Sequence, residues 1–71
     1  MPLVEITLVE GRSQEELRTL ISKVTHACVD SVGAPLESVR VVVREIPPTH
    51  FAAGDVTIDE RRAQRHTPQS L

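Results

Sequence analysis

The sequence predicts one small α+β domain, in which a single βαβ unit with parallel strands precedes a short C-terminal hairpin. Residues 3–9 alternate apolar and polar side chains, residues 39–45 are rich in β-branched side chains, and helical apolar spacing lies between them. Short connections of this kind are typical of a βαβ unit. A chain of 71 residues is marginal as a monomer, and the lone Cys28 forms no intrachain disulfide. We therefore expect an oligomer.

The first strand and the helix have clear sequence signals. The segment LVEITLV (residues 3–9) has the period of a half-buried strand. Ser13 and Glu16 form a capping box with Ser13 as N-cap, and Gly33 is the expected C-cap before Pro35. The helix between them carries an apolar stripe at spacings of three and four, made of Leu17, Leu20, Ile21, Val24, Cys28 and Val32.

The second strand is expected over residues 39–45, with the sequence VRVVVRE. Arg40 and Arg44 lie on one of its faces, with Val42 between them. Since one helix covers one face of a two-stranded sheet, we expect the face with Val42 to meet another subunit.

The C-terminal part has weaker signals. A short hairpin is expected around the turn Gly54-Asp55, because Asp tolerates left-handed backbone geometry better than most residues. Residues 59–71 lack apolar periodicity and are expected to form a short helical turn and a tail. The whole chain, residues 1–71, is thus expected to be one domain that is ordered over about residues 2–58.

Composition narrows the classes of partner. A net charge of −2 gives no electrostatic reason to expect nucleic acid or an anionic membrane. The apolar runs are too short to span a bilayer and no export signal precedes the first strand, so we expect a cytoplasmic protein. No Cys/His cluster has zinc-ligand spacing, so no metal is expected. Seven Arg against one Lys are compatible with anionic ligands, because guanidinium groups bind carboxylates bidentately.

Pro2 has two interpretations. Proline is tolerated as the first residue of an edge strand, and this is the commoner reason to find it there. Alternatively, removal of Met1 would expose the secondary amine of Pro2, a group that no internal residue offers. In that case we expect the functional chain to begin at Pro2.

Three segments decide between these interpretations: PLVEITLVEGRS (residues 2–13), APLESVRV (34–41) and HF (50–51). In this order and at these spacings, behind an N-terminal proline, they resemble the 4-oxalocrotonate tautomerase family over residues 2 to about 58. The resemblance implies the tautomerase (MIF-like) fold and a cofactor-independent isomerase. It also implies a homo-oligomer, expected as a hexamer of three dimers, with active sites between subunits.

The implied chemistry suits an N-terminal proline. Tautomerisation moves a proton between an enol oxygen and a distant carbon, so it needs one group that serves as base and then as acid near neutral pH. An α-amine has a pKa of about 8, and burial or neighbouring arginines lower it toward neutrality. No metal or organic cofactor is required.

The resemblance also implies residue roles. Arg12 would bind the distal carboxylate of a dicarboxylate or 2-oxo acid substrate, such as 2-hydroxymuconate from aromatic hydrocarbon catabolism. Arg40 would contact the 2-hydroxy or 2-oxo oxygen and the adjacent carboxylate, and Phe51 would wall the pocket. Without the resemblance, Arg12 reads as a solvated loop residue, Arg40 as a surface residue paired with a Glu, and Phe51 as a core side chain.

Other polar residues have no expected catalytic role. Arg44 is expected in an ion pair at a subunit interface, and Arg61 and Arg62 as charges of the tail. No role is assigned to His50.

Three other functions remain open. A haloacrylate dehalogenase or hydratase on the same scaffold needs a second arginine shortly before Arg12 and an acid near Phe51, where this chain has Val9 and Ala53. A biosynthetic enzyme for a bulkier substrate is open because sequence does not fix pocket volume. A non-catalytic oligomeric module would be favoured if Pro2 or either arginine were missing, and all are present.

Overall fold

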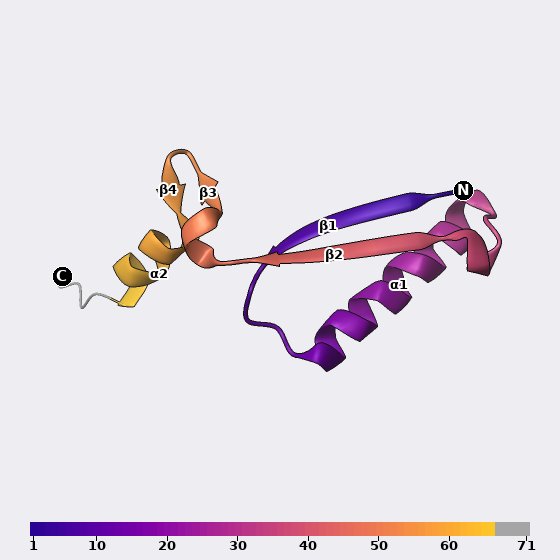
Figure 1. The fold of residues 1–71 in the computed structure, drawn as a ribbon, viewed down its shortest axis with the longest axis horizontal. Helices are drawn as coiled ribbons and strands as arrows, with labels where there is room; N and C mark the ends of the chain where they lie inside the picture. The colour runs from indigo at the N-terminus through magenta and orange to yellow at the C-terminus, as the bar shows by residue number, and fades with distance from the viewer. Residues whose placement is uncertain (67–71) are drawn as a thin grey trace.

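The computed structural model describes residues 1–66 and consists of a βαβ unit followed by a smaller projecting part (Figure 1). The βαβ unit contains β1 (Leu3–Val9), α1 (Gln14–Val32), a 3₁₀ turn η1 (Leu36–Ser38) and β2 (Arg40–Ile46). Residues 47–66 are called the C-terminal arm, and they contain η2 (Pro48–His50), β3 (Ala52–Ala53), β4 (Val56–Thr57) and α2 (Ile58–His66).

The two long strands form a parallel pair, as expected from the short connections. Leu3 is opposite Arg40 at one end of the ladder, and Val9 is opposite Ile46 at the other. β1 has the expected bounds, whereas β2 begins and ends one residue later than expected. The reason is that the backbone N–H of Val39 donates to the carbonyl of Leu36 and closes η1, so Val39 does not join the ladder.

α1 is capped at both ends as its sequence predicts. The Ser13 hydroxyl accepts from the backbone N–H of Glu16 (3.1 Å), and the Glu16 carboxylate accepts from the backbone N–H of Ser13 (2.9 Å). Gly33 adopts the left-handed conformation (φ 69°) that a C-cap requires. The expected apolar stripe is half-buried except for its last member, Val32, which is 70% exposed because little of the described protomer covers the final turn.

The sheet has one covered face and one bare face. α1 lies against one side of β1 and β2, and no described element covers the other (Figure 1). Leu3 and Val42 on the strands are 60% and 39% exposed, and no residue in the described part of the chain is buried. The radius of gyration is 16.6 Å, against about 11 Å for a compact domain of this length. The protomer therefore lacks a core of its own, which supports the expected oligomer.

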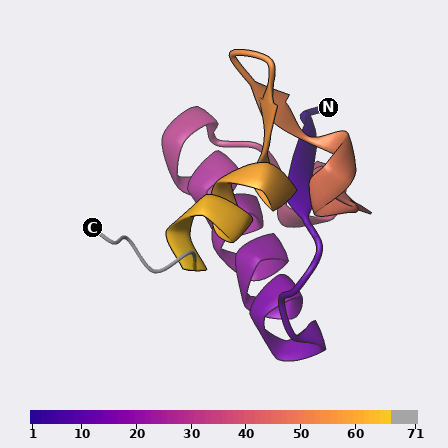
Figure 2. The ribbon, with the colours of Figure 1, turned by 90° about the vertical axis from the view of Figure 1, so that its left-hand side faces the viewer.

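The C-terminal arm begins where β2 ends, and its hairpin and α2 leave that point in different directions (Figure 2). Gly54 and Asp55 both have positive φ (61° and 67°), as a two-residue hairpin turn requires, so the expected turn is confirmed. The expected helical turn after residue 58 is present but longer than expected: α2 has nine residues and includes part of the expected tail. A second capping box, made of Thr57 and Glu60, starts this helix. The helix has no apolar stripe. The rest of the expected tail, residues 67–71, lies outside the described residues.

Neither α1 nor α2, the helices of the described residues, combines the length and apolar character needed to cross a membrane.

Candidate active site

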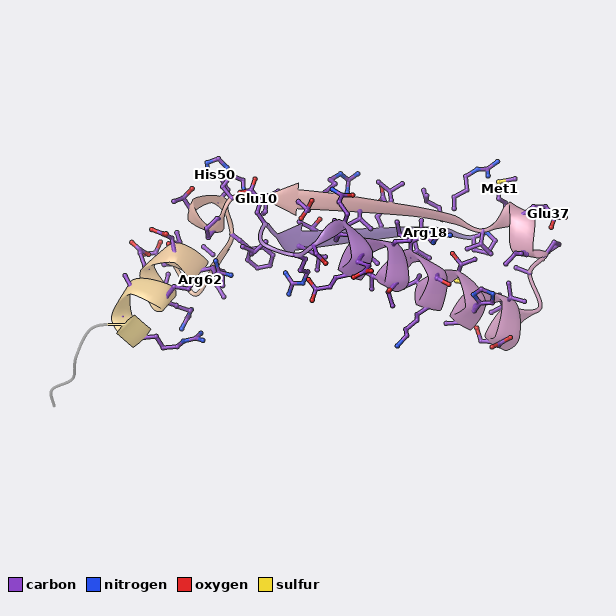
Figure 3. The ribbon with its side chains drawn as sticks, turned by 90° about the horizontal axis from the view of Figure 1, so that it is seen from below. Met1, Glu10, Arg18, Glu37, His50 and Arg62 are labelled. Atoms are coloured by element: carbon purple, nitrogen blue, oxygen red, sulfur yellow. The ribbon has the colours of Figure 1, made fainter. Side chains whose placement is uncertain are left out.

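Pro2 is held at one end of the parallel sheet. Its carbonyl accepts a hydrogen bond from the backbone N–H of Arg40 (3.0 Å), which extends the ladder by one residue before Leu3. Pro2 is half-buried, whereas Met1 in front of it is 84% exposed. Figure 3 shows Met1 at this end of the molecule, close to Glu37 of η1. The backbone that carries the Pro2 nitrogen is therefore anchored rather than frayed.

Arg40 follows η1 directly in the chain and is exposed. Within residues 1–66 its guanidinium makes no hydrogen bond or ion pair. The expectation that it pairs with a Glu on the surface is therefore not met in the protomer. An exposed guanidinium without a protein partner keeps its donors available for an anionic ligand.

Arg12 lies at the opposite end of the sheet. Seven residues of β1 at about 3.3 Å each place it more than 20 Å from Pro2. Gly11 has a φ of 130°, which turns the chain out of β1, and the capping box at Ser13 begins the helix immediately afterwards. The guanidinium of Arg12 donates to the carbonyl of Val9 (3.0 Å), so the side chain is tied to the end of its own strand.

Phe51 also lies at the end remote from Pro2. It follows η2, in which the backbone N–H of His50 donates to the carbonyl of Pro47 (2.9 Å), and its own carbonyl accepts from the backbone N–H of Ile58 (2.8 Å). In Figure 3 His50 lies near Glu10, far from Met1. Phe51 is half-buried in the protomer and is not a core side chain.

One protomer therefore does not bring the four expected site residues together. Pro2 and Arg40 lie at one end of the strands, and Arg12 and Phe51 lie at the other. A site that uses all four must draw on at least two chains. The bare sheet face and the projecting C-terminal arm give the protomer the surfaces for such an assembly.

Two other arginines have partners that the sequence did not predict. Arg44 forms an exposed ion pair with Glu5 of its own chain (3.0 Å), so the expected pairing across an interface is corrected to a pairing across the sheet. Arg61 was expected to be a charge of the tail, but it donates to the carbonyl of Ala53 in the hairpin (3.0 Å). The pattern Thr57-x-x-Glu60 is a capping box like the one that starts α1, and it would have predicted the helix that carries Arg61.

The donors at these positions suit a carboxylate ligand rather than a cation. Arg12, in the loop between β1 and α1, and Arg40, at the start of β2, both have exposed guanidinium groups. Within residues 1–66 no group of three or more His, Cys, Asp or Glu side chains is arranged to hold a metal ion.

Comparisons with known proteins find similar proteins over most of the chain. A family model described as "Tautomerase enzyme" matches residues 2–61. A 2-hydroxymuconate tautomerase of Stutzerimonas stutzeri is 48% identical over 54 residues, which cover 76% of this chain and 86% of that protein. The crystal structure of TomN, a 4-oxalocrotonate tautomerase homologue in the tomaymycin biosynthetic pathway, matches with a TM-score of 0.85 and 44% identity over 87% of this chain and 95% of that one. A heterohexameric 4-oxalocrotonate tautomerase from Chloroflexus aurantiacus J-10-fl matches with a TM-score of 0.82 and 37% identity, over 84% and 97% of the two chains.

Proposed function

Because the chain belongs to the 4-oxalocrotonate tautomerase family and is thus an isomerase, we propose that it ketonises 2-hydroxydienoates such as 2-hydroxymuconate, with Pro2 as the catalytic base. The observation that carries the proposal is the anchoring of Pro2 through its carbonyl to the backbone of Arg40. This hydrogen bond holds the nitrogen at a defined place, as a general base requires.

The reaction needs Met1 to be removed. While Met1 is attached, the Pro2 nitrogen is part of a tertiary amide and its lone pair is delocalised into the peptide bond. Once it is free, the amine takes the proton of the 2-hydroxyl group as electrons shift along the dienol. The resulting ammonium then returns that proton to the distal carbon, which gives the 2-oxo-enoate. The substrate and product are isomers, so no redox partner is needed.

The arginines act on the charges of the substrate. Arg40 stabilises the dienolate, whose negative charge develops on the 2-oxygen during the proton transfer. Arg12, supplied by a neighbouring chain, binds the distal carboxylate and fixes the direction in which the substrate lies. Phe51 from a neighbouring C-terminal arm excludes water, which favours the neutral amine.

The proposed assembly is a homohexamer of three dimers. The bare sheet face and the absence of a buried core in the described protomer support it, as does the similarity to a heterohexameric relative. We also propose a cytoplasmic location, which agrees with the free thiol of the half-buried Cys28.

The test is turnover of 2-hydroxymuconate by the Met1-free protein, followed by absorbance, beside the analogue that lacks the distal carboxylate. We expect kcat/KM to favour the dicarboxylate by about tenfold or more, because only that substrate uses the Arg12 contact. Turnover of neither compound would refute the proposed substrate class.

A second candidate is a tautomerase for a bulkier intermediate of a biosynthetic pathway. The similarity to TomN favours it. The Pro47-Pro48 pair also stiffens the segment that leads to Phe51 and can change the shape of the pocket mouth. In the same assay this function predicts slow turnover of 2-hydroxymuconate and faster turnover of a larger 2-hydroxydienoate.

A further inference from the structure

The hairpin next to Phe51 is too short to be rigid by itself. β3 and β4 have two residues each, and they pair only as Ala52 with Thr57 and Ala53 with Val56. An isolated two-stranded hairpin is marginal even when it is longer. Some other element must therefore fix the backbone on which Phe51 is carried.

α2 supplies the additional contacts. The backbone N–H of Ile58, its first residue, donates to the carbonyl of Phe51 (2.8 Å), and the guanidinium of Arg61 donates to the carbonyl of Ala53 (3.0 Å). The reciprocal hydrogen bonds of the Thr57–Glu60 capping box (2.8 and 3.0 Å) fix the point at which the helix begins. The segment 51–53 is thus held at both ends by one helix.

We propose that Arg61 is a positioning residue, which holds Phe51 in its place as the pocket wall through the carbonyl of Ala53. This inference rests on the proposed function, from which the role of Phe51 is taken. Arg61 acts only on the backbone of the hairpin and needs no contact with the substrate.

The hydrogen bonding separates Arg61 from the other cations of α2. Arg62 and Arg65 lie on the same helix, and within the described residues neither donates a hydrogen bond to the hairpin. Figure 3 shows Arg62 on α2, at the end of the molecule remote from Met1. A bond from a guanidinium to a carbonyl is charge-assisted and stronger than one between neutral groups. Replacement of Arg61 therefore loses a constraint on residues 51–53, whereas replacement of Arg62 removes the same charge and no constraint.

In the proposed oligomer, Phe51 of one chain walls the site that contains Pro2 of another chain. Loss of the constraint on Phe51 should therefore be measurable at that Pro2. A displaced ring admits water, and hydration favours the protonated amine. The apparent pKa of the Pro2 amine should therefore rise toward that of an ordinary α-amine. Removal of a nearby cation would raise it as well, so Arg62→Ala is the matched control for charge.

The experiment uses Met1-free protein with ¹⁵N-labelled proline. The Pro2 amine is titrated by NMR, and the pH profile of kcat/KM is measured on the same samples. The variants are Arg61→Ala, Arg61→Lys, Arg62→Ala, Phe51→Ala and the double variant Phe51→Ala/Arg61→Ala, and the assembly of each is checked by sedimentation. We expect Arg61→Ala to raise the amine pKa and to lower kcat/KM by about tenfold. Arg62→Ala should change both quantities far less than Arg61→Ala does. Arg61→Lys, which keeps a donor and the charge, should stay close to wild type in both.

The double variant tests the route of the effect. If Arg61 acts through Phe51, then Arg61→Ala adds nothing in the Phe51→Ala background. An undiminished effect in that background, or equal effects of Arg61→Ala and Arg62→Ala, would overturn the proposal. If the Arg61→Ala chain does not assemble, the Arg61→Lys variant decides instead. A titration of the Pro2 amine like that of wild type supports the proposal, and a failure to assemble like that of the Ala variant refutes it.

The titration also separates this inference from the proposed function. A wild-type protein that turns over neither substrate defeats the proposed function, while the NMR comparison of Arg61→Ala with Arg62→Ala still decides the role of Arg61.

Discussion

Arg40 and Arg44 allow catalysis and fold stability to be separated on a single strand face. They lie four residues apart on β2, so their side chains share one face of the strand, and both are exposed. Arg40→Ala breaks no hydrogen bond or ion pair of the described protomer, so its effect on folding should stay within about 0.5 kcal/mol. Arg44→Ala breaks the exposed ion pair with Glu5, a loss of about 0.2–1 kcal/mol. By stability alone, Arg44→Ala should therefore be the more harmful change.

Activity should follow the opposite order. Loss of one preorganised donor to the developing charge costs about 2–4 kcal/mol, so Arg40→Ala should lower kcat/KM by roughly 30- to 1000-fold, with a large part in kcat. Arg12→Ala should act chiefly on KM, because the distal carboxylate is bound equally in substrate and transition state. Arg44→Ala should stay within about threefold of wild type, as expected for an exposed pair.

The assay is ketonisation of 2-hydroxymuconate followed by absorbance, with urea unfolding of each variant. Equal losses from Arg40→Ala and Arg44→Ala would refute the reasoning, as would kcat/KM values for Arg12→Ala and Arg40→Ala within twofold of wild type.

Two further predictions concern the N-terminus and the bare sheet face. A chain that retains Met1, or that carries an N-terminal tag, should fold and assemble yet lose nearly all activity, because its Pro2 nitrogen remains an amide. Intact mass spectrometry of each preparation, paired with its reaction rate, checks this prediction. Full activity of a chain that still carries Met1 would exclude Pro2 as the base. Val42→Lys should dissociate the oligomer at micromolar concentration, because it places a third cation between Arg40 and Arg44 on the face that we expect to be covered. Sedimentation of this variant as an intact, active hexamer would show that the face is not an interface.

The fold could be predicted where a local rule decided the structure. The alternation in residues 3–9 gave the bounds of β1, and the Ser13–Glu16 box and Gly33 gave the two ends of α1. The turn at Gly54-Asp55 followed from backbone preferences of the two residues. A helical turn was expected after residue 58, but its length was underestimated, because the start of α2 depends on a capping box and residues 59–66 lack an apolar stripe.

The candidate site was harder to predict, because the residues proposed for it are far apart in the protomer. Sequence spacing pointed to Pro2, Arg12, Arg40 and Phe51 as candidates only through the resemblance to a family. It did not indicate that the length of β1 separates Pro2 from Arg12. Partners such as Glu5 for Arg44 and Ala53 for Arg61 depend on strand register and helix placement, which the pattern of residue types leaves undetermined.

Subunit mixing tests most directly whether Pro2 and Arg12 of one active site come from different chains. A tagged chain with a blocked Pro2 and an intact Arg12 is unfolded and refolded with an equal amount of the Met1-free Arg12→Ala chain. After random assembly, about one site in four combines an intact Pro2 with an intact Arg12 from a neighbouring chain. The mixture should therefore regain about a quarter of wild-type activity. A mixture no more active than the average of the two parent oligomers would contradict a site shared between chains.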